Sequence, residues 1–110
     1  MTAALLSVET TRHGPTARVT IRGALDMASA PNLQAVFDRE IGAGVTRLVV
    51  DLRDLDFMDS AGISLAINLA RRARETGFDL AFIPGPPRVH RVFELCEVAS
   101  VLTFLDPAAN

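Results

Sequence analysis

Apolar and polar residues alternate along the first part of the chain. In "ARVTIRG" (residues 17–23), alanine, valine and isoleucine alternate with arginine and threonine, and "LLSVET" (residues 5–10) precedes this segment. Alternation with a period of two is typical of an antiparallel strand with one buried face. The intervening "HGPT" (residues 13–16) carries a Gly-Pro turn signal. The pattern therefore predicts a β-hairpin.

Three later segments repeat their apolar residues with the spacing of a helix. The first is expected to begin at Ser29 or Ala30, with a proline in its first turn, where the missing N–H would be unpaired in any case. The expected ranges are 29–44, about 60–76 with Gly77 as its stop, and a third helix that opens at Pro86 or Pro87. The residues expected to face the core are Leu33, Val36, Phe37 and Ile41 in the first helix and Val89, Val92, Phe93 and Cys96 in the third.

The second helix has a wide apolar arc. Its expected core stripe consists of Ile63, Ala66, Ile67, Ala70 and Ala73, with Leu65 and Leu69 beside it. An arc of this width favours packing against a neighbouring helix, and a groove for a partner is the alternative interpretation.

Short apolar runs separate and follow the helices. They are "RLVVDL" (47–52), "FDLAFI" (78–83) and "VLTFL" (101–105). Such runs are typical of strands that are covered on both faces. The predicted order is β-β-α-β-α-β-α-β, which indicates an α/β fold with helices packed on a mixed sheet. Since no repeat, linker or low-complexity segment is visible, we expect residues 1–110 to form one domain.

The composition excludes several classes of function. Apolar residues make up 49% of the chain and the net charge is −2, so no basic field favours direct binding to nucleic acid or to an anionic membrane. Tryptophan and tyrosine are absent, which removes the stacking aromatics of single-strand binders. All eleven cations are arginine, so no lysine is available for a Schiff base or a phosphate-binding loop.

The sequence predicts a cytoplasmic protein. Its single cysteine, Cys96, cannot form an internal disulfide, which favours a reducing compartment. The N-terminal residues lack the charged and apolar regions of a signal peptide. No apolar run approaches the ~20 residues of a membrane span.

The segment "FMDSAGIS" (residues 57–64) is the main candidate for chemistry. Ser60 starts the second predicted helix, where serine is a favoured N-cap. A reactive role is the alternative, because Asp59 could provide the cap while Ala61 and Gly62 leave the hydroxyl open. The glycine also carries a helix-propensity cost that needs a reason.

A catalytic role for Ser60 lacks the residues that it would require. A nucleophilic serine needs a base within hydrogen-bond reach, and neither His13 nor His90 lies in a recognisable motif. The segment is not a G-x-S-x-G elbow either. We therefore expect no enzyme, which makes a small hydrolase the least favoured hypothesis.

Four aspartates surround the end of the third predicted strand, namely Asp51, Asp54, Asp56 and Asp59. An aspartyl-phosphate site would also need a lysine, and none exists. Weak binding of a divalent cation or simple solvation remain the interpretations of this cluster. The glycines of "GAG" (residues 42–44) precede a strand, whereas a dinucleotide-binding loop follows one, so we expect no bound cofactor.

Asp26 follows a predicted strand and precedes a helix. A capping or turn aspartate is the simpler interpretation. The alternative is a surface contact beside the Ser60 loop, because both segments follow strands of one sheet.

These segments together resemble a known family. "GALDMASAPNL" (23–33), residues 48–83 with "FMDSAG", and "PRVHRVFELCEVASVLTFLD" (87–106) resemble the STAS domain of bacterial anti-sigma factor antagonists. The resemblance covers about residues 5–106 and implies a STAS fold.

The resemblance also implies a switch. Ser60 matches the serine that a partner anti-sigma factor, itself a serine kinase, phosphorylates with its own ATP. The unmodified form binds the anti-sigma factor and frees the sigma factor. The phosphorylated form is released, and a PP2C-type phosphatase restores the unmodified form. Asp26 matches an aspartate of the kinase-binding surface, and the expected partner surface also includes Asp59, Ala61 and Gly62. We expect amides at the helix N-terminus to tolerate the phosphate.

Two positions depart from the family pattern. Ala61 stands where a second hydroxyl is frequent, and Ser64 stands where glycine is common. Other uses of a STAS domain stay open, such as a subunit of a lipid-transport or stress-signalling complex, a ligand binder, or a phosphorylation-independent paralogue.

Overall fold

The computed structural model describes residues 5–106. Strands β1 (Ser7–His13) and β2 (Thr16–Leu25) form the predicted antiparallel hairpin, with Ser7 opposite Arg22 and His13 opposite Thr16. Both strands are longer than their apolar patterns indicated. The predicted single domain also included residues 1–4 and 107–110, which lie outside the described residues.

The remaining strands add to β2 in a mixed sheet. Strand β3 (Arg47–Asp51) pairs parallel with β2, and β5 (Asp79–Ile83) pairs parallel with β3, which gives the order β1-β2-β3-β5. A short fifth strand, β4 (Leu55–Met58), pairs parallel with the last residues of β2. The predicted α/β class, with helical crossovers between parallel strands, is confirmed.

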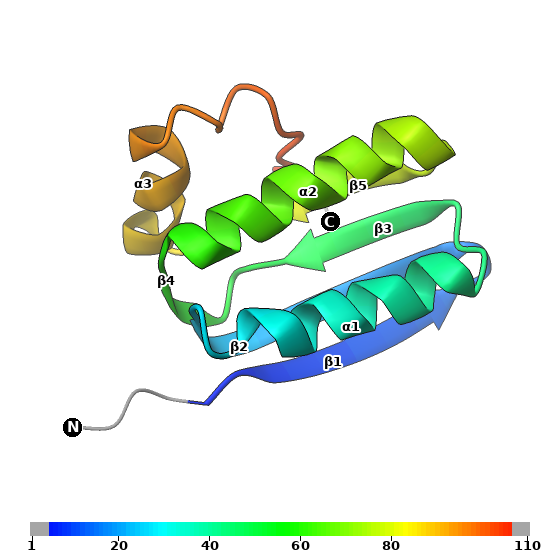
Figure 1. The fold of residues 1–110 in the computed structure, drawn as a ribbon, viewed down its shortest axis with the longest axis horizontal. Coiled ribbons are helices and arrows are strands. Elements are labelled where there is room, and N and C mark those ends of the chain that lie inside the picture. The colour runs from blue at the N-terminus through cyan, green and yellow to red at the C-terminus, as the bar shows by residue number, and fades with distance from the viewer. Residues whose placement is uncertain (1–4, 107–110) are drawn as a thin grey trace.

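Three helices pack on this sheet, and α1 and α2 lie along one of its faces (Figure 1). Their bounds are α1 (Ala30–Gly42), α2 (Ser60–Thr76) and α3 (Pro87–Leu95). The starts and stops agree with the predicted signals, since Gly77 ends α2 with a left-handed φ of 85°. No helix among residues 5–106 is long and apolar enough to cross a membrane.

The core lies between the helices and the inner face of the sheet. Its completely or almost completely buried side chains include Ile21, Leu33, Phe37, Leu48, Val50, Leu69, Val89 and Phe93. Inner residues of β2 alternate with outer ones, so Arg18 and Arg22 project from the face that the helices leave open. The hairpin pattern therefore predicted which face of β2 is buried.

Three details of the prediction were wrong, and one strand was missed. Ile67 is 44% exposed, because the buried arc of α2 is centred on Leu65, Ala66 and Leu69. In α1, Val36 and Ile41 are partly buried and pack against the core as predicted, and Glu40, which was not expected in the core, is also buried and is ion-paired with Arg12.

The other two details concern the C-terminal part. Cys96 follows α3 as its C-cap and is exposed. The predicted last strand is reduced to one parallel bridge between Phe82 and Phe104. Strand β4 was not predicted at all.

Candidate functional site

Parallel pairing of β2 and β4 brings the candidate residues to one end of the sheet. Leu25 is opposite Met58, and the Asp59 N–H donates to the Leu25 carbonyl oxygen at 3.2 Å. Asp26 and Asp59 each follow one of these two strands, so the two predicted segments lie side by side. The N-terminal ends of α1 and α2 are at this same end (Figure 1).

Asp59 is the N-cap of α2. Its backbone is extended, with φ −110° and ψ −168°, and its Oδ1 accepts from the Ala61 N–H at 2.8 Å. The capping interpretation of Ser60 is therefore wrong, because Ser60 is the first residue of the helix. Its side chain is exposed and forms no hydrogen bond with residues 5–106.

Gly62 serves the core and not access to Ser60. It is buried, and a Cβ atom added to it would lie 2.4 Å from Met58 Cγ and 3.1 Å from Leu25 Cδ2. A larger residue at this position would force the Met58 side chain to move, or α2 to draw away from β2 and β4. The propensity cost of glycine in the first helical turn is explained by this contact.

Asp26 closes the turn between β2 and α1. Its Oδ1 accepts from the Ala28 N–H at 3.0 Å and from the Ser29 N–H at 2.9 Å. Ser29 Oγ accepts in turn from the Asp26 N–H at 3.0 Å. The hydrogen bond from the Ser29 amide, together with the weaker bonds, holds the pKa of Asp26 below its ordinary value.

These contacts confirm that Asp26 is a turn aspartate. Its side chain is still partly exposed, and it follows β2 at the same end of the sheet as Ser60. The reciprocal Ser29 contact was missed, although the spacing of "DMAS" contains both partners. The turn role leaves a role at the surface available to the same residue.

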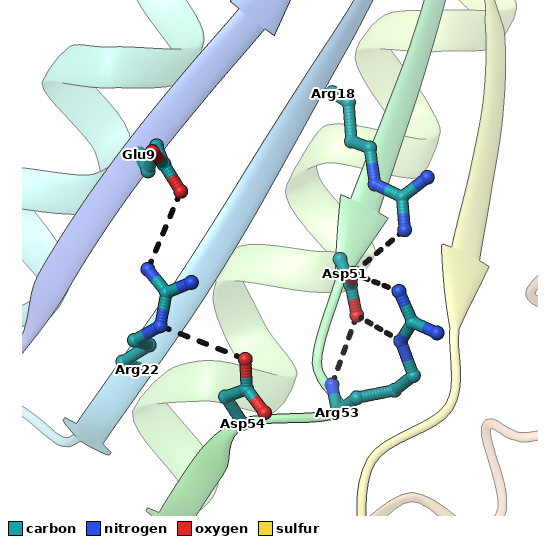
Figure 2. Close-up of polar contacts among 6 residues, drawn as sticks. All are labelled: Glu9, Arg18, Arg22, Asp51, Arg53 and Asp54. Carbon is teal, nitrogen blue, oxygen red and sulfur yellow. Dashed lines mark hydrogen bonds and ion pairs between the residues drawn. The ribbon is translucent and has the colours of Figure 1, made fainter.

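The other acidic residues of this region are paired with arginines. Buried Asp51 accepts from Arg18 at 2.9 Å and from Arg53 at 2.8 Å, while Asp54 lies 3.6 Å from Arg22 (Figure 2). These side chains lie on the face of the sheet that is opposite the helices. The predicted acidic cluster is therefore divided among separate ion pairs.

Among the acidic residues of this network, Asp51 has the most strongly shifted pKa. Burial alone would raise its pKa, but the hydrogen bonds from Arg53 and Arg18 outweigh burial and lower the pKa to about 2. The fourth acid, Asp56, lies 3.7 Å from Arg88 of α3. No group of three potential metal ligands occurs within residues 5–106.

Neither histidine forms a hydrogen bond with Ser60 in the described part of the chain. His13 pairs with Thr16 at the start of β2, and Asp26 follows the other end of this ten-residue strand. At 3.3 Å per residue, the two ends lie roughly 30 Å apart. His90 packs edge-on against Phe104, with 4.8 Å between ring centres, and its Nδ1 is buried without a hydrogen-bond partner among the described residues.

A shallow hollow lies between α1 and α2 beside this site. Its volume is about 420 Å³, and its lining residues are Met27, Ala30, Pro31, Gln34, Ala61, Ser64, Leu65 and Asn68. Met27 is 80% exposed. The surface next to Ser60 is thus partly apolar as well as acidic.

Residues 7–108 match the family model of the STAS domain. BtrV of Bordetella bronchiseptica is 30% identical to this chain over 90 residues, which covers 82% of this chain and 74% of BtrV. The anti-sigma-B factor antagonist of Staphylococcus aureus is 27% identical over 90 residues, covering 82% of this chain and 83% of that protein.

The fold also matches solved structures. Unphosphorylated SpoIIAA, an anti-sigma factor antagonist, gives a TM-score of 0.78 at 19% identity, covering 94% of this chain and 91% of SpoIIAA. The phosphorylated form of Bacillus SpoIIAA gives 0.71 at 17% identity, covering 94% and 95%. At these identities the likeness shows a shared fold.

Proposed function

Because this chain belongs to the STAS domain family, we propose that it is an anti-sigma factor antagonist whose binding is switched by phosphorylation of Ser60. The S. aureus relative and SpoIIAA are both named as antagonists of this kind, and a phosphorylated form of SpoIIAA is known. The observation that carries the proposal is the exposed Ser60 hydroxyl, which is free of hydrogen bonds to residues 5–106. Ser60 follows Asp59 directly and is at the same end of the sheet as Asp26, because β2 and β4 end side by side.

The protein acts as a binding partner and as a substrate of the kinase. Its unmodified form binds the anti-sigma factor, and this releases the sigma factor for transcription. The anti-sigma factor holds the ATP and transfers its γ-phosphoryl group to Ser60 Oγ; ADP leaves, and the hydroxyl proton passes to a base of the kinase or to solvent. A PP2C-type phosphatase reverses the step by hydrolysis, and the whole cycle takes place in the cytoplasm.

The phosphate acts through its charge at the surface. The Ala61 N–H already donates to Asp59 Oδ1 at 2.8 Å, and the Gly62 N–H donates to the Asp59 carbonyl oxygen at 3.0 Å. These two amides of the first turn are therefore already engaged in the unmodified chain, so tolerance of a phosphate on Ser60 by the helix N-terminus stays a prediction. The phosphate's charge of about −1.5 to −2 lies next to the Asp59 carboxylate, so complex formation would have to desolvate two neighbouring negative charges that repel each other.

The proposal is tested by phosphorylation with the anti-sigma factor kinase encoded by the same genome. The protein is incubated with this kinase and ATP, and the modified residue is mapped by mass spectrometry. Ser64 lies one turn further along α2 and is also exposed, which makes Ser64→Ala the matched control. We expect Ser60→Ala to abolish labelling and Ser64→Ala to retain it. Labelling that persists in Ser60→Ala, or none in the wild type, contradicts the proposal.

A further inference from the structure

Two adjacent residues of this chain could each cap α2. Asp59 and Ser60 are both favoured N-cap types, but a helix has only one N-cap. Asp59 occupies that position, with its carboxylate on the Ala61 N–H at 2.8 Å. Ser60 is thereby placed one residue further on, as the first helical residue.

The position decides what the serine oxygen does. A serine at the N-cap accepts a hydrogen bond from an amide of the first turn, so its side chain points back at the helix end. A serine one residue later has no such bond to make, and Ser60 is exposed with none to residues 5–106. An oxygen that must attack a phosphoryl group in line has to be free of such a bond and accessible.

We propose that Asp59 is a positioning residue for phosphorylation: by capping α2 it keeps the Ser60 hydroxyl free as the acceptor. This inference rests on the proposed function, because it concerns the same serine. Without the Asp59 side chain, Ser60 becomes the only capping side chain at this end of α2, and its oxygen turns toward the amides of the first turn.

The surroundings leave Asp59 no substitute. The Asp59 amide is bound to the Leu25 carbonyl oxygen at 3.2 Å, and the close contact of Gly62 with Met58 fixes how deeply α2 sits on the sheet. The neighbouring carboxylate of Asp26 is already engaged by two amides of its own turn. If Asp59 loses its carboxylate, Ser60 is therefore the neighbouring residue that takes over as the N-cap of α2.

The first experiment needs no kinase. The equilibrium constant of unfolding is measured by denaturant titration for the wild type, Ser60→Ala, Asp59→Ala and the double variant. We expect Ser60→Ala alone to change this constant about two-fold or less, as for an exposed residue without a bond. In the Asp59→Ala background, where Ser60 has become the cap, Ser60→Ala should raise the equilibrium constant of unfolding about five-fold. Equal effects of Ser60→Ala in the two backgrounds overturn the inference.

The second experiment measures kcat/KM of phosphorylation for the wild type, Asp59→Asn and Asp59→Ala. Asparagine caps a helix as well as aspartate but has no charge. We expect Asp59→Ala to lie about five-fold below Asp59→Asn, because only the alanine variant sends Ser60 to the cap. Equal values for the two variants overturn the inference. An unlabelled wild type instead defeats the proposed function, and the unfolding cycle still decides the role of Asp59.

Discussion

Replacing Gly62 by alanine tests how closely α2 packs beside the switch serine. The added Cβ atom would lie 2.4 Å from Met58 Cγ, 2.7 Å from Met58 Sδ and 3.1 Å from Leu25 Cδ2. All three atoms belong to buried side chains of the core. Met58 would have to leave its present position, or α2 would have to move away from the sheet.

The net effect on stability combines two opposing contributions. Overpacking of a well-packed core costs about 1–3 kcal/mol. Alanine is a better helix former than glycine by about 1 kcal/mol, which offsets part of this cost. We therefore expect Gly62→Ala to lower the free energy of unfolding by about 1 kcal/mol, and a domain of this size should lose roughly 5 °C in Tm.

Gly42→Ala is the matched control for this measurement. Gly42 is the last residue of α1, and no atom lies within 4 Å of a Cβ added there, so its variant should be neutral or slightly stabilised. Both variants are compared with the wild type by thermal and urea unfolding. If Gly62→Ala is as stable as Gly42→Ala, α2 does not pack against Met58 in the way described, and the explanation for Gly62 is wrong.

Three further predictions concern charge. Ser60→Asp should weaken binding to the anti-sigma factor about 30- to 150-fold relative to Ser60→Ala, measured by calorimetry, because two to three kcal/mol of repulsion and desolvation oppose the contact; equal affinities contradict this. The folded pKa of Asp51, about 2, lies below its unfolded value near 3.8, so its ion pairs stabilise the fold above pH 4 and this contribution, about 2 kcal/mol, is lost as the pH falls toward 2. Asp51→Asn should therefore be less stable at pH 7 and should flatten the dependence of unfolding free energy on pH between 4 and 2, and an unchanged slope contradicts this. Asp26→Asn should retain the turn, whereas Asp26→Ala should lose about 1 kcal/mol by urea unfolding; equal losses would show that the Asp26 hydrogen bonds do not hold the turn.

Local patterns predicted most of the secondary structure. The alternation in β2 showed which residues are buried, and the proline and glycine signals located the ends of α1 and α2 within a few residues. These features depend on backbone preferences and on neighbours along the chain, so they can be recognised without tertiary contacts.

Strand β4 and the end of the chain illustrate what such patterns miss. Strand β4 has four residues, of which only the first and last are buried, and it pairs with β2 over a register shift between Gly23 and Ala24. The apolar run near Phe104 has the composition of a strand, yet it forms a single bridge. Pairing with a distant segment decides both outcomes.

The segment around Ser60 also combines features that the sequence predicts with features that depend on tertiary contacts. The sequence by itself determined that two residues able to cap a helix, Asp59 and Ser60, stand together at the start of a predicted helix. It also showed that the chain has no lysine, no nucleotide-binding loop and no histidine in a recognisable catalytic motif. It could not determine which of Asp59 and Ser60 caps α2, or why Gly62 is glycine. Tertiary structure decided both, because the Asp59 amide bonds to Leu25 of β2 and α2 packs against Met58 of β4. Contacts between segments that are far apart in the chain thus place Asp59 at the cap and leave the hydroxyl of Ser60 exposed.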